Sequence, residues 1–403
     1  MRHFLYIVDS DMHSLFGCKG WIALFFRRAL AESGNEVHTL AEVESGMPGK
    51  IDVAFVQDTF EYQSLQGWRE KFFPDVPCLF VSTNDDISGY PPLWENLFGV
   101  FAFTHADFSL CGIPKEMLVR LSCPVREFAD YYFYDPVPKI CRMVYFPTGH
   151  TVENDRILFD FCRKSNVELT VVSDEYRFLC DVLPLSIKVV SPEHARQVLQ
   201  DAHLVLASGY EALCAMALCK PCIIFGDYGL GGLVTSRNYD LLEDIAFRGR
   251  KGGYFREVIP AKLLEAVVQS VFMTDYAEEL RVVQRIIQER HSWNRFVTTV
   301  NETVERLLVL QDALQDANRQ KELKPCLSSL ARVEVKEDKS ILWRGMVCFG
   351  ELDDDMADIL QQCDGTLAVD GLTALNGLTD EDAEVLWQNL LALWKEKIIF
   401  FKL

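Results

Sequence analysis

Short runs of consecutive apolar residues, separated by polar or helical segments, recur through the first part of the chain. Such runs are typical of strands that are buried on both faces of a parallel sheet. The predicted strands are residues 4–8, 37–40, 51–56, 78–81 and 98–103. A helix is predicted over about 21–33, where Gly34 ends it. This alternation of strands and helices predicts a doubly wound parallel sheet.

Polar residues follow several of these strands, and the carboxyl ends of parallel strands meet at one edge of a sheet. These residues are His13, Asp58, Asp85, Asp86 and His105. A histidine whose pKa is near neutrality can act as a general base towards a hydroxyl group, and a nearby aspartate can orient it. We therefore take His13, His105 and Asp58 as candidate catalytic residues. A loop histidine without a catalytic role is the alternative.

A second sheet is predicted after residues 136–138, where two prolines mark a linker between domains. Strands at 142–146 and 168–172 flank a helix over about 152–164, and a turn at 147–150 precedes that helix. A further helix begins at Ser191-Pro-Glu, because proline is favourable in a first helical turn.

The stretch 204–234 has a strand–helix–strand pattern and contains residues that could bind a ligand. A strand at 204–207 enters a Ser-Gly turn, and an Ala/Leu/Met-rich helix then runs until Lys220-Pro221 ends it. A second strand at 222–225 opens into a glycine-rich loop. Backbone amides and the amino end of a helix can hold a phosphate group at such a place. A buried strand–helix–strand unit that binds nothing is the alternative.

This stretch resembles the donor-binding segment of GT-B glycosyltransferases, in which E-A-M-A-x-G-K-P ends the helix. Residues 215–221, Ala-Met-Ala-Leu-Cys-Lys-Pro, match that ending. Two departures place Cys214 where the family has its ribose-binding glutamate and Cys219 where it has glycine. Glu211 lies almost one helical turn earlier and could reach the same ribose. Residues 28–40 and Arg290-His-Ser-Trp-Asn294 resemble two further elements of this family, the first strand–helix–strand unit and the break before its last helix.

The resemblance implies a nucleotide-sugar donor, favours a UDP-sugar, and predicts that no metal is tightly bound. The donor-binding residues that it implies are Thr148, Gly149, His150, Ser208, Gly209, Glu211, Gly229, Gly231, Gly232 and Arg237. Arg237, Arg248 and Arg250 stand in polar, Gly-rich sequence and could bind a diphosphate through their forked guanidinium groups. They could equally be ordinary solvated loop charges.

The pattern changes after residue 325. A hairpin is predicted at 331–335 and 340–344, a strand at 347–349, helices at 353–362 and 381–396, and a closing strand at 398–401. This order, with Ile-Leu-Gln-Gln-Cys-Asp-Gly-Thr at 359–366, resembles the PqqD-like winged-helix family of precursor-peptide chaperones. The resemblance implies that a peptide adds as a strand to the edge formed by residues 340–349. The implied peptide-binding residues are Leu342, Trp343, Val347 and Phe349. An ancillary packing domain is the alternative.

The net charge of −19 argues against a nucleic-acid partner, because phosphate binding depends on clustered basic residues. The 13 cysteines show no regular spacing and indicate reduced, buried thiols in a cytoplasmic protein. Cys219 and Cys222 are interpreted as a buried structural pair and not as a metal or redox site. No secretory signal is recognised, and Glu211 and Lys220 make the apolar stretch 204–226 a poor membrane span.

The predicted fold is α/β, with two Rossmann-like doubly wound domains of the GT-B type and a small C-terminal winged-helix α+β domain. The predicted boundaries are 1–137, 138–310, a linker at 311–325, and 326–403. The first functional hypothesis is sugar transfer from a nucleotide-sugar donor to a peptide or protein acceptor. The alternatives are a catalytically degenerate scaffold that binds peptides, and a glycosyltransferase of capsule or lipid-linked glycan assembly. Oligomeric state, donor sugar and stereochemistry stay open.

Overall fold

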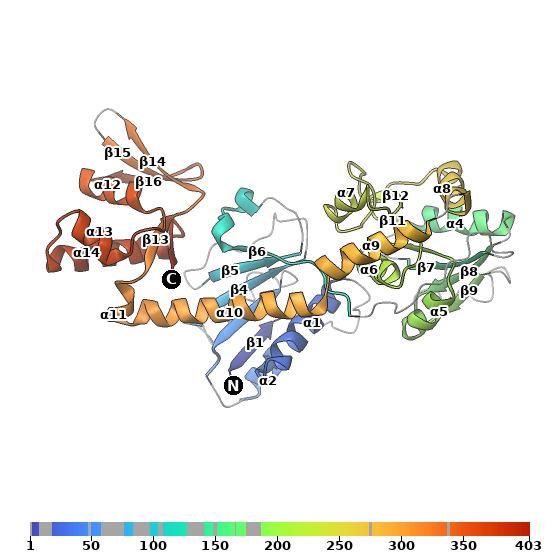
Figure 1. The fold of residues 1–403 in the computed structure, drawn as a ribbon, viewed down its shortest axis with the longest axis horizontal. Helices are drawn as coiled ribbons and strands as arrows, with labels where there is room; N and C mark the ends of the chain where they lie inside the picture. The colour runs from blue at the N-terminus through green and yellow to red at the C-terminus, as the bar shows by residue number, and fades with distance from the viewer. Residues whose placement is uncertain are drawn as a thin grey trace. The chain divides into compact units, whose positions relative to one another are not determined.

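The computed structural model describes residues 2–7, 18–46, 50–57, 76–83, 97–103, 108–126, 141–147, 151–165, 167–174, 187–273, 276–336 and 339–403 (Figure 1). Contacts divide the chain into two compact units. One unit comprises most of the described residues up to Leu121 together with Val297–Leu403, and the other comprises Ser122–Phe296. Among the described residues, no helix combines the length and the hydropathy that crossing a bilayer requires.

The first unit contains a six-stranded sheet of order β2-β1-β3-β4-β5-β6, in which all neighbouring strands are parallel. Its elements are β1 (His3–Ile7), α1 (Cys18–Glu32), β2 (Glu36–Thr39), α2 (Leu40–Glu44), β3 (Val53–Gln57), β4 (Cys78–Ser82), β5 (Leu97–Ala102), the 3₁₀ turns η2 (Phe108–Cys111) and η3 (Lys115–Met117), and β6 (Leu118–Arg120). The ring of buried Phe26 on α1 lies 5.2 Å from that of Phe101 on β5, so α1 packs on the sheet. The strands predicted from apolar runs are therefore present and paired in parallel.

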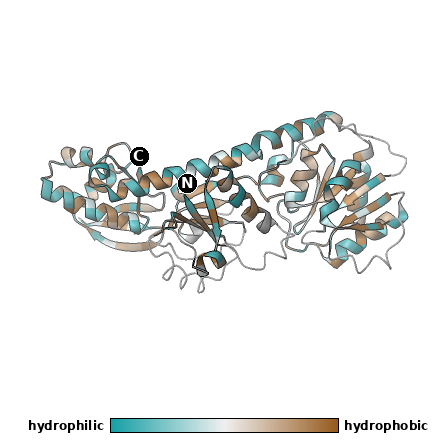
Figure 2. Cartoon of the chain, turned by 90° about the horizontal axis from the view of Figure 1, so that it is seen from below, coloured by the Kyte–Doolittle hydropathy of each residue, from teal (hydrophilic) through white to brown (hydrophobic). Residues whose placement is uncertain are grey.

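The second unit contains a six-stranded sheet of order β12-β11-β10-β7-β8-β9. Its elements are β7 (Cys141–Tyr145), α4 (Val152–Lys164), β8 (Val167–Val172), β9 (Ile187–Val190), η5 (Pro192–His194), α5 (Ala195–Asp201), β10 (Leu204–Ala207), α6 (Gly209–Ala217), β11 (Cys222–Gly226), β12 (Gly229–Leu233), α7 (Tyr239–Glu243), α8 (Ala261–Met273), α9 (Ala277–Arg290) and α10 (Trp293–Gln315), whose later residues belong to the first unit. Leu204 and Leu206 of β10 pack in the hydrophobic cluster on one face, and Val205 and Ala207 pack in the cluster on the other. Figure 2 accordingly shows the strands of this sheet as mostly hydrophobic.

The C-terminal module follows α11 (Ala317–Gln320) and has its own core of buried apolar side chains. Its elements are β13 (Lys324–Leu327), β14 (Ala331–Lys336), β15 (Lys339–Arg344), β16 (Val347–Leu352), α12 (Asp354–Gln362), α13 (Val369–Leu375), α14 (Asp380–Lys395) and β17 (Ile399–Lys402). Strands β14, β15 and β16 form an antiparallel meander, and β13 pairs with β17. The predicted fold class, two Rossmann-like domains and a small α+β domain, is therefore confirmed.

Within the first unit, the C-terminal module contacts the N-terminal sheet near the amino ends of β5 and β6. The rings of Phe98 and Trp394 meet edge to face with centroids 5.3 Å apart. Arg344 donates a hydrogen bond to the carbonyl oxygen of Gly112 at 3.1 Å, and the Ser329 hydroxyl donates one to Glu116 at 2.8 Å. The module thus packs at the amino edge of this sheet, opposite the edge at which polar residues follow the strands.

The glycine-rich segment after β11 differs from its prediction as a loop. Gly229–Leu233 forms β12, which pairs antiparallel with β11 and bulges between Ile224 and Phe225. A Cβ at Gly231 would overlap the carbonyl oxygen of Gly249, and one at Gly226 would overlap that of Arg248. These glycines are required because the backbone of residues 248–253 packs directly on the hairpin.

The carboxyl end of α6 holds Cys219 in a backbone conformation that favours glycine. The amide of Cys219 donates to the Met216 carbonyl at 3.0 Å, and the amide of Lys220 donates to the Ala215 carbonyl at 3.0 Å. These two bonds form a Schellman motif, in which the residue after the C-cap adopts the left-handed conformation. Cys219 does so with φ of 53°. A side chain with a Cβ is strained there.

We expect Cys219→Gly to be more stable than Cys219→Ala by about 1 kcal/mol, because both lose the thiol and only alanine keeps the strained Cβ. Urea unfolding of the two variants side by side measures this difference. The matched control is the buried strand residue Cys222, where the glycine variant should be the less stable of the pair. Equal stability of the two Cys219 variants would contradict the strain argument.

Candidate functional site

The strand order of the second sheet creates a switch point between β7 and β10. These strands are parallel neighbours, with Tyr145 paired to Leu206, although the chain forms β8 and β9 between them. The connections that leave the two strands diverge, which opens a crevice at their carboxyl ends in sheets of this topology. The residues that follow Tyr145 and Ala207 are therefore the first place to look for a ligand site.

The segment after β10 brings three predicted residues to this position. Ser208 and Gly209 are buried, and Ser208 is the N-cap residue of α6. Gly209 has φ of 58°, and its amide donates to the Phe247 carbonyl at 3.0 Å. A Cβ at Gly226 would lie 3.0 Å from the Cβ of Ser208, so the end of β11 adjoins the turn. The Ser-Gly turn and the strand exit predicted from sequence are thus adjacent.

Glu211 lies in the first turn of α6, where its carboxyl group is partly buried. Burial raises the pKa of Glu211 to about 7, and a hydrogen bond with its own backbone amide opposes that rise. A carboxyl group that titrates near neutrality can either donate to or accept from a hydroxyl group. Cys214, one turn later, contacts Tyr210 through a hydrogen bond, and burial is the main reason why the pKa of Tyr210 is raised.

The arginines near the glycine-rich segment divide into two kinds. Arg248 forms an ion pair with Asp227 at 2.5 Å and lies over the ring of Tyr228, and Arg250 forms one with Glu257 at 2.5 Å. The Arg248–Asp227 pair fastens the segment that begins at Arg248 to the turn between β11 and β12, whereas the Arg250–Glu257 pair lies within that segment. Arg237 is exposed, and the described part of the chain contains no ion pair for it. Of the three cations, Arg237 is the one whose charge stays open to a ligand.

The other glycines of the segment have conformational roles. Gly229 has φ of 85°, and a Cβ there would lie 2.6 Å from the Glu257 carboxylate. Gly232 has φ of 83° with open space around it. Both conformations lie in the left-handed region that favours glycine. Because residue 229 has no side chain, the Glu257 carboxylate can lie close to the hairpin.

The first sheet has its own switch point, between β1 and β3. His13 follows β1, and Asp58 comes directly after Gln57, the last residue of β3. At this edge the Tyr6 hydroxyl donates to the buried Gln57 side chain at 2.9 Å. The predicted residues that lie outside the described residues are His13, Asp58, Asp85, Asp86, His105, Thr148, Gly149 and His150.

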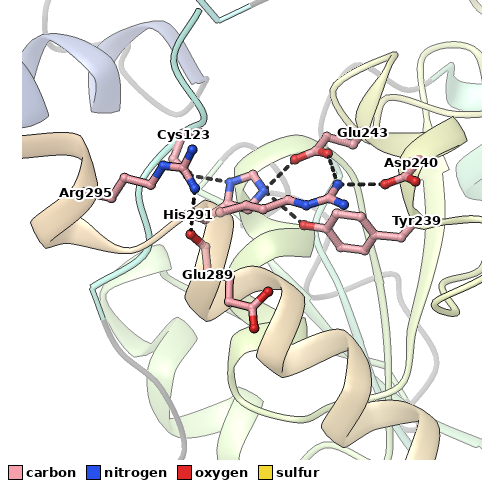
Figure 3. A network of polar contacts seen from close by, with 8 residues as sticks. Cys123, Tyr239, Asp240, Glu243, Glu289, His291 and Arg295 are labelled. Atoms are coloured by element: carbon pink, nitrogen blue, oxygen red, sulfur yellow. Dashed lines mark hydrogen bonds and ion pairs between the residues drawn. The ribbon is translucent and has the colours of Figure 1, made fainter. Parts of the chain in front are cut away.

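Sequence reasoning missed a buried polar network around His291 (Figure 3). One ring nitrogen of His291 is 2.9 Å from the Cys123 carbonyl oxygen, and the other is 2.9 Å from both the Glu243 carboxylate and the Tyr239 hydroxyl. Burial by itself would raise the pKa of Glu243, but hydrogen bonds and charges from His291 and Arg290 lower it overall. The network joins α7, the junction of α9 with α10, and residues 123–125. In the sequence, the feature that could have indicated this network is the position of His291 between two amphipathic helices.

Burial also defines the chemistry of the two cysteines that flank Lys220. It raises the pKa of both the Cys219 and the Cys222 thiol. Metal binding and redox exchange use the thiolate, which burial disfavours. The Lys220 ammonium donates to the carbonyl oxygens of Gln200 and Ala202 at 2.6 and 3.1 Å, so this turn is a packed structural junction.

The sequence matches no protein-family model and no curated protein. Among solved structures, the chain is similar to the apo form of the lipopolysaccharide outer core galactosyltransferase WaaB, with 11% identity, a TM-score of 0.48, and coverage of 77% of this chain and 100% of that chain. It is also similar to UGT89C1 of Arabidopsis thaliana, with 12% identity, a TM-score of 0.44, and coverage of 76% and 99%. A third similar structure is UDP-GlcNAc 2-epimerase of Neisseria meningitidis bound to UDP-GlcNAc, with 10% identity, a TM-score of 0.40, and coverage of 77% of this chain and 100% of that chain. One fold hosts many activities, so the residues at the site decide the function.

The raised pKa of Glu211 predicts that stability falls as pH rises. Between the ordinary value of 4.5 and about 7, the folded state holds a proton that the unfolded state has released, so ionisation at higher pH costs folding free energy. We expect Glu211→Gln to remove this cost and to raise the melting temperature at pH 8, by the equivalent of about 3 kcal/mol, with a much smaller effect at pH 5.

Calorimetry at both pH values measures this effect, and the exposed Glu193 provides the control variant Glu193→Gln. The control should shift neither melting temperature. An equal gain at pH 5 and pH 8 would mean that Glu211 does not titrate in this window.

Proposed function

We propose that this protein is a glycosyltransferase that takes a sugar from a nucleotide-sugar donor and transfers it to a peptide or protein acceptor. The observation that carries the proposal is the convergence of Ser208, Gly209 and Glu211 at the β7–β10 switch point, at the position where the sequence resembles the donor segment of GT-B glycosyltransferases. The likeness in sequence and the position in the fold are independent of each other. Their agreement favours this site over a unit that binds nothing.

The roles of the donor residues follow from their chemistry. The first turn of α6 has a partial positive charge, which suits the donor phosphates. The Glu211 carboxyl group would bind a ribose hydroxyl, in place of the family glutamate at the position of Cys214. Arg237 and the β12 glycines would lie on the phosphate side, and a UDP-sugar is the favoured donor. His13 or His105, with Asp58 to orient it, would deprotonate the acceptor hydroxyl if the enzyme inverts.

The proposed acceptor site is the free edge of β16 in the C-terminal module. Val347 and Phe349 are 61% and 40% exposed, and Phe349 is the extra residue of a bulge opposite Leu342 and Trp343. Sheet edges are normally protected by charges or by a covering segment, so exposed apolar residues on an edge suit an added strand.

Of residues 340–349, which were predicted to form the peptide-binding edge, only those of β16 lie on an edge strand. Strand β15 is the central strand of the meander, and Leu342 on it is only 2% exposed. Among the described residues, the buried indole nitrogen of Trp343 has no hydrogen-bond partner, and Arg332 lies over the indole ring. Leu342 and Trp343 therefore lie on the central strand and not on an edge. We keep Val347 and Phe349 as the proposed peptide contacts.

The position of the C-terminal module limits how close the captured peptide segment and the modified residue can be in the acceptor sequence. It packs at the amino edge of the first sheet, whereas His13 and His105 follow the carboxyl ends of strands. A strand of this sheet spans roughly 20 Å, which an extended peptide covers with about six residues. We propose that the captured peptide segment and the modified residue are separated by at least that length. Such a spacing fits a leader segment better than a site immediately beside the modified residue.

For the donor site, we expect one of UDP, GDP and CMP to bind saturably to the purified protein in calorimetric titration, with or without Mg²⁺. Glu211→Ala should weaken that binding by about 10-fold or more, because the lost hydrogen bond to a ribose hydroxyl is worth about 1.5 kcal/mol or more when charged. Glu193→Ala is the control and should bind normally. Unchanged binding by the Glu211 variant would exclude its ribose role, and no binding of any nucleotide would favour the catalytically degenerate scaffold.

For the acceptor site, synthetic peptides encoded by short reading frames beside the gene are the probes, and fluorescence anisotropy measures their binding. We expect Phe349→Asp and Val347→Asp each to weaken binding of the selected peptide about 10-fold, because a charge on an apolar docking strand is desolvated by the added peptide. The matched control is Val335→Asp on the opposite edge strand β14, where Val335 is 64% exposed.

Equal losses for the Val335 variant would contradict the choice of β16. Sugar transfer to a glycan or lipid-linked acceptor that is insensitive to Phe349→Asp would favour the glycan-assembly alternative.

A further inference from the structure

Three metal-ligating side chains meet at the amino edge of the first sheet, on strands β1 and β2. His3 is the first residue of β1, and Glu36 and His38 are the first and third residues of β2. The parallel register pairs His3 with Glu36, and Leu5 with His38. Because successive side chains alternate between faces of a strand, these positions share one face of the sheet. Two strands thus present two imidazoles and a carboxylate to the same point.

The separations between the ligand atoms match those of a metal site. Nδ1 of His3 is 3.1 Å from Nε2 of His38 and 3.3 Å from Oε2 of Glu36, and the His38 and Glu36 atoms are 3.8 Å apart. In a tetrahedral zinc site with bonds of about 2.1 Å, neighbouring ligand atoms are about 3.4 Å apart. The three atoms therefore outline one triangular face of a tetrahedron of the size that zinc requires.

The surroundings suit an ion that is bound by side chains on one side and accessible to solvent on the other. The side chains of His38, His3 and Glu36 are 8%, 29% and 46% exposed, so the site opens towards solvent at Glu36. The imidazole rings stack within 13° of parallel. A further carboxylate lies nearby, because Asp52 accepts a hydrogen bond from the His3 amide at 2.8 Å. The local charge favours a divalent cation.

We propose that His3, Glu36 and His38 bind one zinc ion, with an exchangeable ligand in the fourth position, and that this ion fastens the amino end of β1 to β2. Imidazole and carboxylate ligands in tetrahedral geometry suit zinc. The site departs from the expectation of no tightly bound metal. It lies at the amino ends of β1 and β2, whereas the candidate catalytic residues follow strands in the sequence, so its proposed role is structural and does not depend on the proposed transferase function.

The test uses the full chain, freed of metal by dialysis against a chelator under reducing conditions and titrated with zinc chloride in competition with a chromophoric chelator. We expect Glu36→Gln and His3→Gln each to weaken binding by more than the roughly 10- to 100-fold that loss of an outer-shell partner costs. Zinc should raise the melting temperature of the wild type and leave that of Glu36→Gln unchanged. Glu36 is exposed, so the Glu36 variant should fold, which circular dichroism checks.

The matched control is His194→Gln, which removes an exposed histidine of the other unit and should bind zinc normally. Cobalt(II) provides a second readout, because nitrogen and oxygen ligands give ligand-field bands without a thiolate charge-transfer band. A thiolate band, or unchanged affinity in the Glu36 and His3 variants, would assign the metal to cysteines and overturn the proposal. Absence of zinc binding would overturn it as well and leave the cluster as a hydrogen-bonded triad.

Discussion

The parallel pairing of β7 with β10 is the constraint on which the proposed donor site depends. Both strands are covered on both faces by apolar clusters, so a slip in register would move every side chain to the wrong face and would bury the polar residues that follow the strands. The register therefore fixes where the chain leaves the sheet after Tyr145 and after Ala207. The first turn of α6, with Ser208 and Glu211, takes its position from this pairing and not from its own sequence.

Close backbone contacts and ion pairs stabilise the loops around this site. The 248–253 segment packs on the β11–β12 hairpin where glycines leave no side chain between the two backbones, and Arg248 and Arg250 tie the same segment to Asp227 and Glu257. Near α7, one ring nitrogen of the buried His291 lies within hydrogen-bond distance of both the Glu243 carboxylate and the Tyr239 hydroxyl. Buried polar groups of this kind are favourable only when each has a partner, so these contacts specify one arrangement of the loops.

The two edges of the first sheet have different proposed tasks. Polar residues with candidate chemistry follow its carboxyl ends, whereas its amino ends serve attachment. The C-terminal module packs there through Trp394 and Arg344, and the cluster of His3, Glu36 and His38 lies at the same edge on other strands. In the proposed function, this division would separate capture of an acceptor from its modification. It also allows a structural metal site that takes no part in the chemistry.

The sequence by itself determined the main strands and helices, their order and the α/β class, because a buried parallel strand needs a continuous apolar run and a helix needs its own period and caps. It also marked the Ser208–Glu211 turn, which is local. It did not predict β12, whose glycines carry no strand pattern, or α13, or the central position of β15. The partners of Arg248 and His291 and the meeting of His3 with His38 were decided by tertiary structure alone. Each of these depends on which strands or segments become neighbours, and that choice is made by packing between residues far apart in the chain.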